Sequence, residues 1–216
     1  MNSSIIYYSS NQEDPIFENK IVENLKEQAG DIPIISVSRK PMELGTNICI
    51  GEQPVCYSNS WKQLLVGLKE AKTKFCIAAE SDCLYPPEYF QFIPPREDIV
   101  YRYGNVWAFW TNRGRFWQKP RCEGAQMCGR EYWIERLEEI VGWHEGWEQM
   151  REHPSRIVTK IFLEEDRSSW TGNPVITFLT GRGTGNNKTS LKTVPPQISL
   201  PYWGTSQSIR ERFLCT

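Results

Sequence analysis

Short apolar runs alternate with segments of helical periodicity over the first 80 residues of this 216-residue chain. The three runs are SIIYYSS (4–10), IPIISVS (32–38) and KFCIAA (74–79). Each run is long enough for one buried strand. Between them, helices are predicted from Pro15 to Gly30 and from a cap at Ser58 or Ser60 onward. This alternation predicts an α/β fold with a mostly parallel central sheet flanked by helices.

Two carboxylates, Glu80 and Asp82, come directly after the third apolar run. The carboxyl ends of parallel strands meet at one edge of a sheet, and open α/β sheets bind ligands at that edge. Two carboxylates in a turn are able to hold a divalent cation, which in turn holds the diphosphate of a nucleotide. The alternative is structural, with Asp82 capping the turn and the helix that follows it.

The composition fits a single folded domain, because 39% of the residues are hydrophobic and 24% are charged. No apolar run reaches the ~20 residues of a membrane helix, and the first residues lack the layout of a secretory signal. We therefore expect a cytoplasmic protein without a membrane span or an obligate protein partner. The seven cysteines form no C-x-x-C pair, and only His144 and His153 could join them. Reduced, mostly buried thiols are expected rather than a zinc cluster.

The net charge of −1 conceals two segments that contain basic but no acidic side chains. The first spans residues 99–122, where arginines and lysine alternate with tyrosine, tryptophan and phenylalanine. The second runs from Arg167 to Arg210 and includes Arg182 in the glycine-rich loop 181–185. Local concentrations of positive charge favour an anionic partner even in a protein that is neutral overall.

The second half of the chain predicts further strands and a helix. Two aromatic runs divided by Gly104 and Asn105 predict a β-hairpin. A helix is predicted within residues 129–143 and a late strand within 173–180. The proline-containing tail is expected to be a wrap or a flexible lid.

Several motifs of this sequence resemble those of GT-A fold glycosyltransferases of a family-2-like, phage or bacterial type. The residues that carry the resemblance are Gly67-Leu68, Ala71, Phe75, Ile77, Glu80-Ser81-Asp82 and Pro87, in that order. The segment CEGAQMCGREYWIERLEEIVGW is similar to the acceptor side of such enzymes. The match spans roughly residues 3–180. Two departures, Glu80 in place of Asp and Leu65 in place of an Asn that many members carry, bear on the identity of the nucleotide.

The resemblance implies a Rossmann-like GT-A domain that uses a nucleotide-sugar donor, a UDP-sugar, and Mn²⁺ or Mg²⁺ held by Glu80 and Asp82. It divides the chain into a nucleotide-sugar-binding half at about 1–98, an acceptor-binding half at about 99–180, and a loop and tail at 181–216. The residues expected to bind the donor are Ser9, Ser10, Asn11, Arg39, Glu80, Ser81, Asp82 and Arg182.

A catalytic base is also implied, since an acceptor hydroxyl must lose its proton. The late acidic group resembles the acidic pair of the family, so Asp166 is expected to be the base, with Glu165 as the next candidate. A solvated helix end is the alternative reading of this group, and His144 is another candidate base. We expect an inverting hexosyltransferase.

The charge pattern indicates DNA as the acceptor, specifically a hydroxymethylated pyrimidine extruded from the duplex. The residues expected to contact the acceptor are Arg102, Trp107, Trp110, Arg113, Arg115 and Trp117. A glycan or lipid-linked acceptor is the alternative, because aromatic side chains suit sugars equally well. A non-catalytic nucleic-acid-binding domain on a transferase scaffold remains a third possibility.

Overall fold

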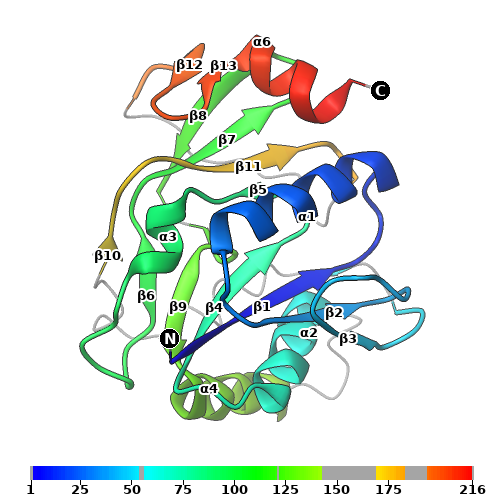
Figure 1. Ribbon diagram of the computed structural model, residues 1–216, viewed down its shortest axis with the longest axis vertical. Helices are drawn as coiled ribbons and strands as arrows, with labels where there is room; N and C mark the ends of the chain where they lie inside the picture. The colour runs from blue at the N-terminus through cyan, green and yellow to red at the C-terminus, as the bar shows by residue number, and fades with distance from the viewer. Residues whose placement is uncertain (1, 54–55, 121, 143–168, 183–193, 216) are drawn as a thin grey trace.

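The structure is a computed structural model that describes residues 2–53, 56–120, 122–142, 169–182 and 194–215. Figure 1 shows a larger sheet in the lower half of the view and a smaller sheet in the upper half, with helix α1 between them. None of the helices in the described part of the chain combines the length and apolar character that crossing a bilayer requires.

The alternating start of the chain folds as predicted. The elements are β1 (Ser3–Ser9), α1 (Pro15–Ala29), β2 (Ile34–Ser38), α2 (Tyr57–Glu70) and β4 (Phe75–Glu80). Helix α1 begins where Asp14 Oδ1 accepts a hydrogen bond from the Ile16 amide at 2.9 Å, and Pro15 occupies the first helical position. It ends at Gly30, whose φ of 59° suits glycine.

Two local details differ from the prediction. Strand β3 (Thr46–Cys49) is not among the predicted strands, and it pairs with β2 at the edge of the larger sheet. Helix α2 starts after Cys56 without a side-chain cap, so the predicted caps Ser58 and Ser60 are wrong.

The larger sheet has the strand order β10-β6-β9-β4-β1-β2-β3. Strands β1 to β4 are parallel to one another, which confirms the predicted mostly parallel core. Strand β9 (Gln126–Gly129) runs antiparallel to β4, β6 (Tyr101–Tyr103) runs antiparallel to β9, and β10 (Ser169–Trp170) runs parallel to β6. Strands from before and after residue 98 therefore share one sheet, and the division into two functional halves stays a prediction.

The smaller sheet has the order β5-β11-β7-β8 and contains the hairpin of the fold. Its strands are β5 (Cys83–Leu84), β7 (Val106–Trp110), β8 (Arg115–Lys119) and β11 (Val175–Leu179). The prediction that Gly104-Asn105 joins two hairpin strands is wrong, because β6 and β7 belong to different sheets. The hairpin instead joins β7 to β8 through residues 111–114, where Gly114 has a φ of 60°.

Helices cover both faces of the larger sheet (Figure 1). Helix α2 packs with the predicted helix α4 (Arg130–Gly142), whose Trp133 and Leu137 are buried. Helices α1 and α3 (Pro87–Gln91) lie on the opposite face, and the first turns of α1 also pack against the smaller sheet through Phe17 and Ile21. Helix α1 thus joins the two sheets into one core.

The described part of the tail is a packed wrap rather than a lid. It contains β12 (Ser199–Leu200), β13 (Gly204–Thr205), α6 (Ser206–Ile209) and a π-helical turn (Arg210–Leu214). Trp203 and Phe213 are buried against the smaller sheet, and Trp203 Nε1 donates to the Pro174 carbonyl at 2.5 Å. Burial of these two large aromatic side chains stabilises the packing of the tail against the smaller sheet.

Helix α2 reaches the sheet closely because residue 67 has no side chain. A Cβ at Gly67 would lie 2.3 Å from Ile6 Cγ2 and 3.2 Å from Val37 Cγ2. We predict that Gly67→Ala lowers the free energy of unfolding by ~1–3 kcal/mol, although alanine favours a helix more than glycine does. Urea unfolding measures this change.

Glu70→Ala is the matched control, because Glu70 is exposed in the same helix. It should alter stability by less than ~0.5 kcal/mol. A Gly67→Ala variant as stable as this control would show that the α2–β1 contact is not tightly packed.

Candidate active site

The carboxyl ends of β2, β1 and β4 lie side by side in the larger sheet. Ser9 is in register with Ser38, and Tyr8 is in register with Glu80. The loops after these strands therefore emerge at one edge, where open α/β sheets bind ligands. The predicted donor-binding residues of β1, β2 and β4 are brought together as expected from the strand order.

The side chain of Glu80 is held in a fixed position at this edge. Its Oε1 accepts a hydrogen bond from the Tyr8 hydroxyl at 2.9 Å. The Tyr85 hydroxyl accepts from the Glu80 amide at 2.9 Å and donates to the Gly124 carbonyl at 2.7 Å. A Cβ at Gly124 would lie 2.2 Å from Glu80 Oε2, so this glycine makes room for the carboxylate.

Asp82 lies in the turn between β4 and β5, and its backbone is anchored to the smaller sheet. The Phe178 amide donates to the Asp82 carbonyl at 2.8 Å. Asp82 Oδ1 lies 3.4 Å from the Cys83 Sγ and accepts its weak hydrogen bond. Ser81 is half-buried between the two carboxylates.

None of the described lysines and arginines forms an ion pair with either carboxylate, although the nearby Lys119 acts to lower the pKa of both. Burial, Cys122 and the neighbouring Asp82 raise the pKa of Glu80 well above its ordinary value, and burial raises the pKa of Asp82. A divalent cation on the free oxygens would stabilise both ionised forms. The residues present therefore fit such a cation, with the carboxylates of Glu80 and Asp82 as its ligands.

Three further titratable groups, Lys119, Cys122 and Cys83, lie next to this pair. A hydrogen bond from the Cys83 thiol lowers the pKa of Cys122 to about 7, against the effect of burial. Burial acts to lower the pKa of Lys119, but Cys122, Cys83 and Glu80 together raise it, so this lysine stays protonated. The sequence motif included neither Lys119 nor Cys122, because the fold rather than local spacing places them here.

The loops after β1 and β2 are tied to each other by the predicted donor-binding residues. Asn11, at a φ of 50°, accepts hydrogen bonds on Oδ1 from the amides of Arg39 and Lys40, each at 2.9 Å. Arg39 Nη1 donates to the Ser10 carbonyl at 3.2 Å and its Nη2 forms an ion pair with Glu52. Arg39 therefore helps to build the edge.

Ser9 has a structural role in these loops. Its side chain is buried, its hydroxyl donates to Glu18, and its Oγ accepts from the Asn11 amide. The Ser9 hydroxyl thus both donates and accepts a hydrogen bond within the protein, and these bonds fix the conformation of the loop.

Glu13 is a buried carboxyl at the same edge that the sequence analysis missed. It is 9% exposed, and its Oε1 accepts from the Thr180 hydroxyl at 2.8 Å. Burial raises the pKa of Glu13 to about 7, with Asp82 acting in the same direction. Arg182, a predicted donor-binding residue, lies 3.8 Å from Asp14 and partly offsets this effect. No local motif marks Glu13, because its burial depends on the distant strand β11.

The predicted base residues Asp166 and Glu165, and the alternative His144, lie outside the described residues. Their role stays a prediction.

The predicted acceptor residues fall on two faces of the smaller sheet. Cys83, Thr177, Ala108 and Trp117 are in register across β5, β11, β7 and β8, so they share one face of the smaller sheet. Trp110 lies on this face two residues beyond Ala108. By the same alternation Trp107 faces the opposite way, where it is buried and its Nε1 donates to Asn105 at 2.8 Å.

An aromatic and basic cluster forms at the open end of that face. The Arg113 guanidinium lies 4.2 Å from the Trp110 ring centroid and 5.9 Å from that of Trp117. Arg115 is exposed beside Trp110, with which it is in register. Arg102 lies on β6 in the larger sheet and is separate from this cluster.

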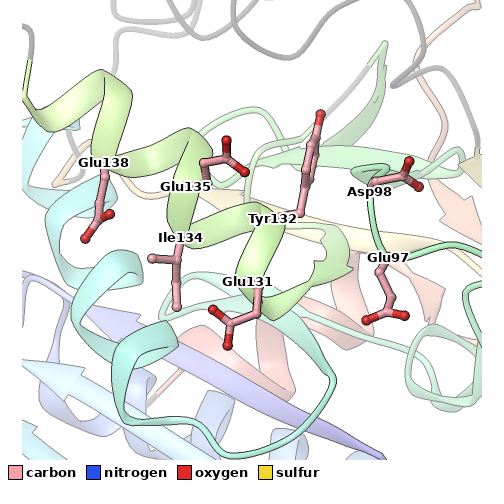
Figure 2. A pocket seen from close by; sticks show the side chains of 7 residues that line it. All are labelled: Glu97, Asp98, Glu131, Tyr132, Ile134, Glu135 and Glu138. Atoms are coloured by element: carbon pink, nitrogen blue, oxygen red, sulfur yellow. The ribbon is translucent and has the colours of Figure 1, made fainter.

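A pocket elsewhere on the protein is strongly acidic. Figure 2 shows the five carboxylates that line it together with Tyr132 and Ile134, from α4 and the segment before β6. It lies beside Gly129, which pairs with Phe75 at the amino end of β4, so it is at the edge opposite Glu80. Each of these carboxylates forms an ion pair with a lysine or arginine, and the pocket lies at the sheet edge away from Glu80 and Asp82, so we do not place the donor in it.

No protein-family model matches the chain, and no curated protein sequence matches it significantly. Among solved structures, the glycosyltransferase GlyE of Streptococcus pneumoniae TIGR4 is similar with a TM-score of 0.50 and 7% identity, over 78% of this chain and 45% of GlyE. A glycosyltransferase involved in glycosylation of the major capsid of PBCV-1 has a TM-score of 0.48 and 12% identity, over 79% and 81% of the two chains. S. aureus TarS 1-349 has a TM-score of 0.48 and 12% identity, over 85% and 59%.

The chain spans less than half the length of GlyE. At this level of identity the likeness concerns the fold. The mostly parallel sheet flanked by helices is accordingly the GT-A type of α/β fold.

The raised pKa of Glu13 predicts a pH-dependent stability. The folded protein favours the protonated Glu13 carboxyl. The contribution of this group to the free energy of unfolding is therefore fully present below about pH 4.5 and is lost as the pH rises through about 7. The free energy of unfolding of Glu13→Gln relative to wild type should increase by ~1–2 kcal/mol between pH 4.5 and pH 8, after allowance for screening by solvent. Urea unfolding at the two pH values measures the difference.

Glu23→Gln is the control for that experiment, because Glu23 is exposed in α1. Its stability relative to wild type should not vary with pH by more than a few tenths of a kcal/mol. Equal pH responses of the two variants would contradict the burial effect at Glu13.

Proposed function

We propose that the protein is a glycosyltransferase that moves a sugar from a nucleotide-sugar donor to a hydroxyl acceptor with the help of a divalent cation. The observation that carries this proposal is the pair Glu80 and Asp82, half-buried at the carboxyl edge of the parallel strands of a GT-A-type fold. Site chemistry supports function more directly than the fold does, because one fold hosts many activities.

The donor side of the site is assigned to the loops after β1, β2 and β4. Glu80 and Asp82 would hold Mn²⁺ or Mg²⁺, which supplies positive charge for the departing nucleoside diphosphate. Lys119 adds a fixed positive charge beside them, and the exposed Arg182 is positioned to approach the phosphates. Asn11 and Arg39 fix the backbone of the loops that would border the nucleoside. A UDP-sugar is the proposed donor.

The proton of the acceptor hydroxyl must pass to a base. Asp166, with Glu165 next, is the proposed base of an inverting transfer. Glu13 is a second candidate supported by its location at the site edge and its pKa of about 7, close to the operating range of a general base.

The acceptor side is assigned to the face of the smaller sheet that carries Trp110 and Trp117. Arg113 and Arg115 add positive charge beside these rings. Stacked aromatic and guanidinium groups suit an extruded base and its phosphates, so DNA with a hydroxymethylated pyrimidine is the proposed acceptor. Trp107 is left out because it is buried on the other face.

Asp82→Asn tests the donor half of the proposal because it removes the charge and keeps the shape. With UDP-glucose, Mn²⁺ and DNA containing 5-hydroxymethylcytosine, we expect UDP release to fall at least ~100-fold, since a metal supplies several kcal/mol of transition-state stabilisation. UDP release and DNA mass are the measurements.

Asp98→Asn is the matched control, because Asp98 is exposed at the opposite edge and pairs with Arg96. It should leave the rate unchanged. A folded Asp82→Asn protein with the wild-type rate would refute the assignment of the cation ligands. UDP release without a gain in DNA mass would keep the transferase and move the acceptor to a glycan or lipid-linked sugar.

Salt dependence of duplex binding tests the acceptor half. Neutralising phosphates releases counterions, so the affinity should fall linearly on a log–log plot against salt, and Arg115→Ala should reduce the slope by ~1. Fluorescence anisotropy of labelled duplex measures both quantities. Arg96→Ala, at the acidic edge, should leave the slope unchanged. Salt-insensitive binding would favour the glycan acceptor, and DNA binding without any nucleotide or metal binding would favour a non-catalytic domain.

A further inference from the structure

The side chains of two buried cysteines, Cys83 and Cys122, lie close to the carboxylate of Glu80. The Sγ atoms of Cys83 and Cys122 and one carboxylate oxygen of Glu80 all lie within 4.8 Å of one another. Cys83 is 1% exposed and Cys122 is 3% exposed, whereas Glu80 is half-buried. The three groups come from β5, the segment before β9 and the end of β4. The cluster therefore has a buried interior and an approach from the Glu80 side.

Backbone hydrogen bonds and the Tyr85 side chain hold the segments that carry these three groups. The Tyr85 hydroxyl joins the Glu80 amide to the Gly124 carbonyl, and the Ala125 amide donates to the Cys122 carbonyl at 3.2 Å. Strand β5 is fixed by its pairing with β11. A site prepared in this way loses little conformational freedom when it binds a ligand.

The spacing matches coordination of one ion. With Zn–S bonds of ~2.3 Å and Zn–O bonds of ~2.1 Å, sulfur and oxygen ligands of a tetrahedral ion lie about 3.6 Å apart. The Cys83 Sγ and Glu80 Oε2 are 3.8 Å apart. Two sulfur donors also select against Mg²⁺, which prefers oxygen, and in favour of thiophilic ions.

The local charge also suits a divalent ion. Two thiolates and one carboxylate would carry a charge of about −3, and Lys119 beside them contributes +1. Asp82 adds a further negative charge beside them, so a divalent cation offsets most of the negative charge of this buried site.

We propose that Cys83, Cys122 and Glu80 form a binding site for a thiophilic divalent cation such as Zn²⁺, with the fourth position open toward Asp82. Binding converts two thiols to thiolates and releases two protons to solvent. The ion would cross-link the end of β4, strand β5 and the segment before β9. The proposal goes beyond sugar transfer and does not depend on it, although Glu80 is shared with the donor site.

Titration of the reduced, metal-free, full-length protein with Co²⁺ under anaerobic conditions tests this site. We expect thiolate-to-cobalt charge-transfer absorption that saturates at one equivalent, disappears when Zn²⁺ is added and persists in excess Mg²⁺. In Cys83→Ser and Cys122→Ser the Kd for Co²⁺ should rise more than ~100-fold, because loss of an outer partner alone costs ~10–100-fold.

Cys76→Ser and Cys49→Ser are the matched controls, one buried in another part of the core and one exposed. Both should titrate as wild type. X-ray absorption spectroscopy of the wild-type zinc form provides a measurement without variants, and we expect two sulfur ligands at ~2.3 Å.

Three results would overturn the site: no charge-transfer band in the reduced wild-type protein, an undiminished band in both cysteine variants, or a zinc shell without sulfur. A Cys83–Cys122 disulfide on exposure to air, combined with no metal binding in the reduced form, would assign the pair to redox chemistry. The titration contains no nucleotide sugar, so its failure leaves the transferase proposal intact. Failure of sugar transfer likewise leaves the cobalt result intact.

Discussion

The two parallel ladders that flank β1 are the constraint on which the candidate site depends. Strand β1 pairs with β2 on one side and β4 on the other, and its side chains from Ser4 to Ser9 are buried. These ladders align the ends of three strands, and the hydrogen bond from Tyr8 to Glu80 fixes the relative position of β1 and β4 beyond the backbone. A register shift of one residue would turn each of these side chains to the other face.

Placing carboxylates at this edge is unfavourable for the protein alone. Glu80 and Asp82 are partly removed from water and close to each other, so burial raises the pKa of both. The backbone donors and hydroxyls around them fix their geometry, and the nearby Lys119 offsets the effect of burial only in part. Ligand binding and stability are therefore linked here, because a cation bound to the folded state stabilises it by mass action. Such an arrangement is typical of a functional site rather than of an element that only holds the fold.

Local signals in the sequence predicted the elements whose cause is local. The Asp14-Pro15 start of α1 and the apolar runs of β1 and β4 lie within a few residues of what they determine. The predicted hairpin at Gly104-Asn105 is wrong because these residues bond to a distant segment instead. The Gly104 amide donates to the Trp170 carbonyl, and the Asn105 side chain donates to the Gly172 carbonyl. Long-range pairing also explains why Glu13 could not be found from the sequence.

The smaller sheet connects the turn that carries Asp82 with the cluster of Trp110, Trp117 and Arg113. Cys83 follows Asp82 directly and begins a row that continues through Thr177 and Ala108 to Trp117. The turn at Asp82 is fixed to this sheet through β11, whose Phe178 amide donates to the Asp82 carbonyl. The same row contains Thr177, whose buried Oγ1 has no hydrogen-bond partner within the described structure. A buried hydroxyl without a partner is costly, so Thr177 is held in this row by strand pairing and packing rather than by a hydrogen bond of its own side chain.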